Sequence, residues 1–162
     1  MKRTIKFLSL LTVAAMLCFA LISCGGGNVA SSGEATLLVD KGDGDYTVYT
    51  VELSKLEKHD EGAVTLLEYL SVQKGTDLYY TVQLGGGYGA YITSINSLKP
   101  DPASEYIAVY TSEESDFSVS SDGMEMPSVK YGEIELKYSG VGISEMNIKD
   151  GTVVMFRLES FA

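Results

Sequence analysis

The sequence predicts an α+β domain in which one short helix covers one face of a mixed β-sheet. Two β-rich runs joined by an Asp- and Gly-rich turn come first, and one segment with helical spacing follows them. The runs after that segment are rich in β-branched and aromatic residues. This order of hairpin, helix and strands is compatible with a β-grasp-like mixed sheet with one covering helix. The alternative is an all-β sandwich with an incidental helix.

Size and charge limit the possible partners. Hydrophobic residues make up 45% of the 162 residues, which is typical of a folded chain long enough for one domain. The chain carries 22 Asp and Glu against 12 Lys and Arg, for a net charge of −10. Because a surface this acidic repels nucleic acid, we expect no nucleic-acid partner.

The N-terminus has the pattern of a lipoprotein signal peptide. The basic segment Met1–Lys6 precedes an apolar run over 7–22, which is shorter than the ~20 residues of a permanent membrane-spanning helix. Leu21–Cys24 (LISC) resembles the bacterial lipobox, in which the cysteine becomes the first mature residue and carries lipids. We therefore expect a signal peptide helix over 1–23 and a lipid on Cys24 that holds the chain at the cell membrane, outside the cytoplasm. An ordinary transmembrane anchor with a chance cysteine is the alternative.

The two cysteines leave no thiol in the predicted mature domain. Cys18 is removed with the signal peptide, and the lipid occupies Cys24. The domain is therefore expected to have no disulfide, no thiolate metal site and no cysteine nucleophile. Residues 24–33 are mostly small and polar, so we expect a flexible tether there and a folded domain over 34–162.

The first elements of the domain are a hairpin and a helix. Ala35–Val39 and Tyr46–Leu53 are predicted to pair, because an Asp- and Gly-rich turn joins them. Thr65 and Glu68 have the spacing of a capping box, which predicts that the only helix of the mature chain begins at Thr65. Gly75 supplies a left-handed stop after the helix.

The rest of the chain is predicted to form strands. Ser112–Val129 is acidic and Ser-rich, and we expect it to be a long surface loop. The predicted strands have β-branched and aromatic residues or strict alternation: Tyr79–Leu84, Tyr91–Ile95, Tyr106–Thr111, Glu133–Tyr138 and Val153–Leu158.

Gly85–Ala90 (GGGYGA) satisfies the pattern G-x-G-x-x-A of dinucleotide-binding loops. That chemistry needs a helix N-terminus directly after the glycines, to direct N–H groups at the pyrophosphate. Tyr91–Ile95 is a predicted strand, so a nucleotide loop is disfavoured. The segment is instead a loop or bulge between strands, or a place where a flat ligand approaches the backbone closely.

Residues that could support catalysis or metal binding are sparse. His59 is the only histidine, and without cysteine it cannot build a conventional zinc site. Asp40–Asp45 lacks the spacing of a calcium loop, and no nucleophile elbow is present for a Ser-His-Asp triad. Glu113 and Glu114 lie in the expected loop and are interpreted as solvated. We therefore expect no catalysis, no metal and no required cofactor.

Four segments, taken in order, resemble the transcobalamin-like C-terminal domain family of bacterial exported and lipid-anchored proteins. The resemblance covers most of residues 35–160 and implies a β-grasp domain, with cobalamin as a possible ligand. The segments are Thr65–Leu70 (TLLEYL), Gly87–Leu98 (GYGAYITSINSL), Ser104–Thr111 (SEYIAVYT) and Ile148–Leu158 (IKDGTVVMFRL).

The resemblance also suggests ligand-binding residues. Tyr88–Ile92 matches the aromatic-glycine segment of the family, and Ile95–Ser97 matches its Ile-Asn-Gly turn with Ser97 in place of glycine. Tyr106 stands where an aromatic pair containing tryptophan is common in the family. Tyrosines also crowd this third of the chain and could form an amphipathic platform. The candidate ligand-binding residues are Tyr88, Gly89, Tyr91, Asn96, Tyr106 and Tyr110.

Together these features predict a lipid-anchored extracytoplasmic binding module for a corrinoid or a similar flat ligand. A β-grasp domain alone offers half of the site that vitamin B12 carriers build with a separate helical domain. The alternative is a protein-interaction or surface-display module that contacts a second envelope protein and has no small-molecule ligand. An enzyme is disfavoured, because no triad, dyad or metal cluster stands out.

Overall fold

The computed structural model describes residues 26–42, 44–85, 87–120 and 126–161. The predicted signal peptide over 1–23 and the predicted lipid site at Cys24 lie outside these residues. Within the described part of the chain, no helix is both long and apolar enough to cross a bilayer.

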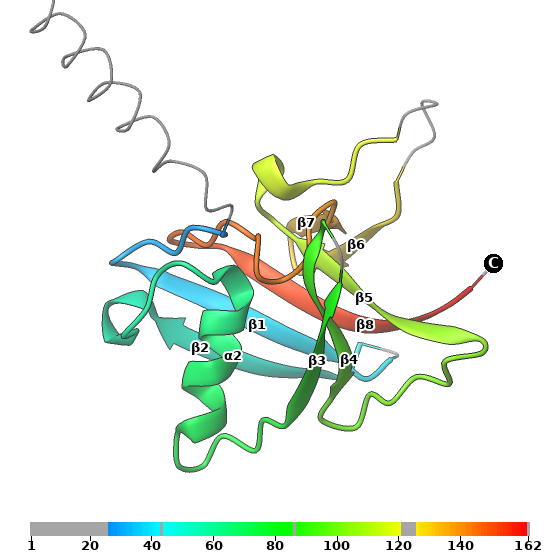
Figure 1. Cartoon of the computed structure of the whole chain (residues 1–162), viewed down its shortest axis with the longest axis horizontal. Helices are drawn as coiled ribbons and strands as arrows, with labels where there is room; N and C mark the ends of the chain where they lie inside the picture. Colours follow the sequence, from blue (N-terminus) through cyan, green and yellow to red (C-terminus); the bar gives the residue numbers. More distant parts are fainter. Residues whose placement is uncertain (1–25, 43, 86, 121–125, 162) are drawn as a thin grey trace, which may run out of the picture.

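A six-stranded mixed sheet forms the centre of the molecule (Figure 1). Its strand order is β2-β1-β8-β5-β7-β6, and β1 and β8 run parallel whereas all other neighbours are antiparallel. The first and last strands of the domain therefore lie side by side in the middle of the sheet. The strands are β1 (Glu34–Asp40), β2 (Tyr46–Glu52), β5 (Glu105–Thr111), β6 (Ser128–Tyr131), β7 (Ile134–Tyr138) and β8 (Val153–Ser160).

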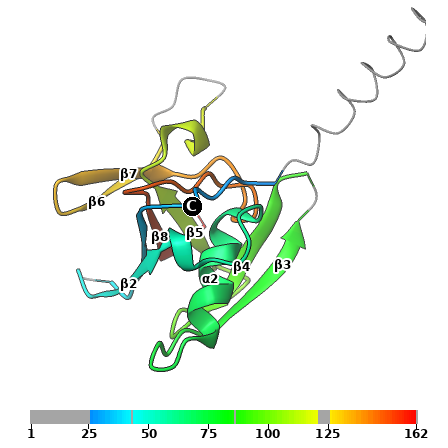
Figure 2. The same cartoon turned by 90° about the vertical axis from the view of Figure 1, so that its left-hand side faces the viewer.

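One face of this sheet is covered by the helix α2 (Gly62–Val72) and by a separate two-stranded hairpin, β3 (Tyr80–Gly85) and β4 (Gly89–Ile95). Figure 2 shows α2 and the hairpin side by side on this face. Short 3₁₀ turns lie at Leu53–Lys55 (η1) and Glu114–Asp116 (η2). The predicted α+β class, with one helix on a mixed sheet, is confirmed.

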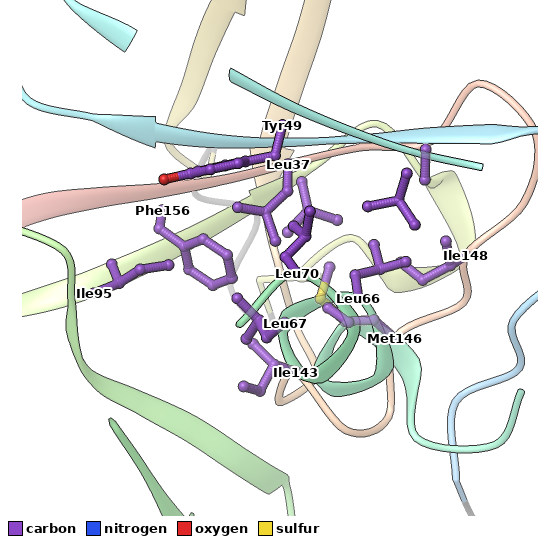
Figure 3. Packing of buried hydrophobic residues seen from close by; sticks show 14 of the residues in the cluster. Leu37, Tyr49, Leu66, Leu67, Leu70, Ile95, Ile143, Met146, Ile148 and Phe156 are labelled. Carbon is purple, nitrogen blue, oxygen red and sulfur yellow. The ribbon is translucent and has the colours of Figure 1, made fainter. Parts of the chain in front are cut away.

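The central strands are buried on both faces. Leu37 and Leu38 are neighbours in β1, so their side chains point to opposite faces, and both are fully buried. In β8, the neighbouring side chains of Met155 and Phe156 also point to opposite faces of the sheet. Leu37 and Phe156 belong to the main core under α2 and the hairpin (Figure 3), whereas Leu38 and Met155 belong to a second core on the opposite face.

The helix begins earlier than the capping box predicts. It starts at Gly62 with Glu61 at the N-cap, and Thr65 lies buried inside the helix instead of capping it. The amide of Ala63 donates to the carbonyl of Ile143, and a side chain at position 62 would collide with the 143–146 backbone. The start of the helix is therefore set by a close contact with a distant loop, which the local spacing could not reveal.

Residues 26–33, which were expected to belong to a flexible tether, are packed against the rest of the domain. Gly27 donates to the carbonyl of Ser144 at 2.8 Å, Val29 is buried and forms a parallel bridge with Ile148, and Val29 also donates to the carbonyl of His59. This segment packs on the domain because its small residues fit against the backbone of the 144–148 loop. Over the described residues, 26–33 are therefore packed on the domain.

Replacement of Gly27 tests whether this segment is docked. A Cβ at Gly27 would collide with the carbonyl oxygen of Met146, so Gly27→Ala is expected to lower the free energy of unfolding by about 1–3 kcal/mol. Gly87→Ala is the matched control, because a Cβ at Gly87 meets nothing within 4 Å. Urea unfolding of the full chain measures both variants. Equal stability of the two variants would contradict the docked arrangement.

Candidate functional site

The β3–β4 hairpin, with Tyr79 directly before it, carries half of the exposed large apolar side chains in the described chain. Five of the ten large hydrophobic residues that are exposed lie there: Tyr79, Val82, Leu84, Tyr88 and Tyr91. We call these five residues the hairpin patch. Leu84, Tyr88 and Tyr79 are the most open of the five, at 85%, 79% and 73% exposure. Val82 and Leu84 share one face of the hairpin with Ile92 and Ala90, whereas Tyr91 lies on the other face beside Gln83. Because exposed apolar side chains clustered on one element often mark binding sites, the hairpin patch is the leading candidate for a binding surface.

The hairpin is also uncharged. Residues 78–98 contain no Asp, Glu, Lys or Arg, although the whole chain has a net charge of −10. A partner that approaches the hairpin therefore meets a locally neutral surface. This favours a partner recognised by apolar contact and backbone hydrogen bonds rather than by charge.

One edge of the hairpin is fixed to the domain. The carbonyls of Tyr88 and Ala90 accept hydrogen bonds from the amides of Gly142 and Ile143, at 2.7 and 2.8 Å. The amide of Ala90 donates to Ser144 Oγ at 2.9 Å. These contacts hold β4 against the 140–146 loop.

The other edge of the hairpin is open. Strand β3 pairs only with β4 among the described strands, in a register that joins Leu84 to Ala90 and Gly85 to Gly89. The pairing shifts between Thr81 and Val82, which marks a bulge or irregularity in the hairpin. The outer side of β3 is therefore available to another strand.

The structure brings together three of the six candidate ligand-binding residues. Tyr88, Gly89 and Tyr91 lie at the tip of the hairpin and at the start of β4. Gly89 has a φ of +85°, and a Cβ there would lie 2.5 Å from Ser144 Oγ, so the position needs glycine. The glycine motif is a hairpin turn followed by a strand, as the sequence indicated, and not the start of a helix.

Asn96 lies at the opposite end of β4 and supports the hairpin from there. Its side-chain oxygen accepts from the amide of Tyr79 at 3.0 Å, and its side-chain nitrogen donates to the hydroxyl of Tyr49 at 2.8 Å. Its φ of 49° places Asn96 in the left-handed region, which asparagine tolerates better than most residues. Asn96 and Ser97 also line a shallow groove of about 580 Å³ between β2 and the end of α2.

Tyr106 and Tyr110 lie on the other face of the six-stranded sheet. Tyr110 is 2% exposed, donates to Glu159 Oε1 at 3.1 Å, and packs edge-on against Tyr138. Burial and the neighbouring charge of Glu159 raise the pKa of the Tyr110 phenol. Tyr106 stacks on Phe161 with a ring separation of 5.1 Å. The sheet therefore separates these two residues from the hairpin tip, and the six candidates do not form one site.

A buried acidic cluster was missed at the sequence level. Glu113 was interpreted as solvated, and Asp116 falls within the expected surface loop Ser112–Val129, but both are buried. Asp116 accepts from the backbone and side-chain amides of Asn147, each at 2.7 Å. Lys149 Nζ lies 2.7 Å from Glu113 Oε2. The cluster ties the start of the loop to residues 147–149, while Glu114 stays exposed as expected.

The hydrogen bonds and the ion pair make this cluster a structural clamp. No group of three or more His, Cys, Asp or Glu side chains in the described residues is placed to hold a metal ion. Burial raises the pKa of Glu113, but hydrogen bonds from Lys149 and Ser115 outweigh it, so the pKa of this carboxyl lies below its ordinary value. The charged form of Glu113 is therefore the one that the fold stabilises.

Comparisons with known proteins show only the fold. No protein-family model matches the chain, and no curated protein matches it. A solved structure described as a putative metal binding protein from Ruminococcus gnavus ATCC 29149 is similar, with a TM-score of 0.51 and 13% sequence identity. The similarity covers 81% of this chain and all of that chain. At this identity the shared feature is the architecture.

Replacement of Glu113 tests the clamp through its pH dependence. Because the pKa of Glu113 is lower in the folded than in the unfolded chain, its contribution is present above the unfolded pKa of about 4.3 and is lost as pH falls through the folded value. Glu113→Gln is expected to lower the free energy of unfolding at pH 7 by on the order of 1 kcal/mol, and the deficit should close at acid pH. Denaturation curves at several pH values measure it. Glu114→Gln is the matched exposed control, and an identical pH profile for both variants would refute the clamp.

Proposed function

We propose that the chain is a lipid-anchored, extracytoplasmic binding module of the β-grasp type that acts without catalysis. The observation that carries this proposal is the hairpin patch: an uncharged, exposed apolar hairpin with one fixed edge and one open edge. A surface of this kind is typical of partner binding.

The strand order supports the β-grasp assignment. An N-terminal hairpin leads into a helix on one face of the sheet, and the last strand returns parallel to the first strand at the centre. The resemblance to the transcobalamin-like family implies the same arrangement. The β3–β4 hairpin and the short strand β6 are additions to this frame.

The sequence supports the lipid anchor. The basic start, the short apolar run and Leu21–Cys24 together form the pattern of an exported lipoprotein. The docked contacts begin at Gly27, three residues after Cys24 in the chain, so a lipid on Cys24 would hold the domain close to the membrane. A module held in this way would meet partners in the cell envelope.

An extended segment of a second envelope protein fits the hairpin best. Strand addition uses the unpaired backbone groups of an open edge for affinity, and exposed alternate side chains for specificity. The outer side of β3 offers such an edge, and Val82 and Leu84 lie exposed on one face of it. The uncharged surroundings suit a partner strand with apolar side chains.

A corrinoid or similar flat ligand is the second candidate. Tyr88, Gly89 and Tyr91 do lie together at the hairpin tip, where a flat ligand could stack on tyrosine and approach the glycine backbone. Titration of the purified full chain with cobalamin, followed by calorimetry and absorbance, tests this candidate. Saturable heat that Tyr88→Ala removes would favour the corrinoid, and no heat at millimolar cobalamin would exclude it.

Replacement of Cys24 tests the anchor. Cys24→Ser is expected to abolish lipid attachment and to shift the chain from the membrane fraction to the soluble fraction or to an unprocessed form. Cys18→Ser is the control, because Cys18 lies inside the predicted signal peptide and carries no lipid. Fractionation with mass spectrometry of the N-terminal peptide measures both. Membrane retention of Cys24→Ser in a processed form would argue against the lipid anchor.

A charge on the open edge tests strand addition. A photo-crosslinking amino acid at the exposed Gln83 is expected to capture one envelope protein in cells that export the chain. Val82→Lys should reduce this product by about tenfold or more, because a charged side chain on an edge strand discourages pairing. Val48→Lys is the matched control, since Val48 is similarly exposed on β2, the edge strand of the main sheet. A crosslinked product of twice the chain mass would show that two copies of the chain pair with each other. That result, or an equal loss of the product in Val82→Lys and Val48→Lys, would contradict a partner strand at β3.

A further inference from the structure

The start of the described chain and the tip of the hairpin meet at one residue. The carbonyl of Ser144 accepts from the amide of Gly27, and the hydroxyl of Ser144 accepts from the amide of Ala90. Figure 2 shows the blue start of the domain beside the ends of β3 and β4 that carry the hairpin turn. The two segments are far apart in the sequence but share one end of the molecule.

This juxtaposition constrains the place of the proposed lipid. Cys24 precedes Gly26 by two residues, so covalent geometry keeps their Cα atoms within about 8 Å of each other. The docked contact of Gly27 fixes the chain immediately after that point. A lipid on Cys24 would therefore bring the bilayer to the end of the domain that carries the hairpin tip.

The tip has the chemistry of a membrane interface. Leu84 and Tyr88 are its two most exposed side chains, and Gly85, Gly87 and Gly89 surround them without side chains of their own. Tyrosine is enriched at the headgroup level of bilayers, because its ring is apolar and its hydroxyl is polar. No charge on residues 78–98 opposes entry into this layer.

We propose that the hairpin tip, with Leu84 and Tyr88, is a second membrane contact that sits in the headgroup layer of a phospholipid bilayer beside the lipid of Cys24. This proposal rests on the lipid anchor proposed above. A weak apolar contact next to a covalent lipid fixes orientation as well as adding retention. It would stand the hairpin on the membrane, so that the open edge of β3 faces sideways toward a partner.

Nearby acidic groups determine which bilayer suits the contact. Glu145 lies against Gly89, and the exposed Asp60 has its carbonyl against Gly26. These carboxylates would be repelled by anionic headgroups. The tip should therefore prefer zwitterionic phosphatidylcholine to anionic lipid, the reverse of a basic membrane anchor.

The absence of tryptophan from the sequence allows a direct test. The full chain, purified with its lipid and reconstituted into phosphatidylcholine vesicles with brominated acyl chains, is compared as Tyr88→Trp and Tyr79→Trp. Tyr79 is the matched control, because it is similarly exposed but lies about 20 Å from the tip along the hairpin. The tryptophan of Tyr88→Trp is expected to be quenched several-fold more strongly and to emit at shorter wavelength.

The outcomes separate this inference from the anchor. Equal, weak quenching in both variants of a chain whose lipid on Cys24 is verified by mass spectrometry would overturn the tip contact and leave the anchor intact. A chain without lipid on Cys24 would overturn the anchor, and the tip contact with it. Stronger quenching in vesicles rich in anionic lipid would contradict the role given to Glu145 and Asp60.

Discussion

The parallel pairing of β1 with β8 is the constraint on which the rest of the molecule depends. It joins residues more than 110 positions apart, from Thr36 with Val153 to Asp40 with Arg157. These two strands are buried on both faces, so both faces of the sheet need a cover. The helix and the β3–β4 hairpin cover one face, and tyrosines of β5 and β7 pack on the other. The hairpin can then expose its own outer edge, because its inner side chains already complete the main core.

The features that sequence could predict are those set by short-range patterns. The first hairpin and the strands near Tyr91–Ile95 and Val153–Leu158 follow from alternation and turn residues, and the structure confirms them. The start of the helix and the docking of residues 26–33 could not be predicted. Both depend on backbone contacts with the 143–148 loop, which has almost no regular structure and no distinctive composition.

The candidate site shows the same division. The glycine turn and its tyrosines were located from sequence, and Tyr88, Gly89 and Tyr91 do lie together. Tyr106 and Tyr110 follow a strand pattern that cannot reveal which face of the sheet they occupy. The buried state of Glu113 depends on Lys149, a partner 36 positions away that no local pattern connects to it. Tertiary pairing therefore decides which polar and aromatic residues remain available for binding.

Hydrogen exchange of the full chain, free of any partner, tests this account most directly. The amides of Leu37–Val39 and Val154–Phe156 are predicted to exchange only when the whole domain unfolds, because they lie in the central strands. The amides of Val82–Leu84 on β3 should exchange many-fold faster as a group, because the outer edge of that strand is open. If the amides of β3 are as protected as those of β8, the outer edge of β3 is covered. That result would contradict the account in which the hairpin on the central sheet has an edge that is free to bind a partner.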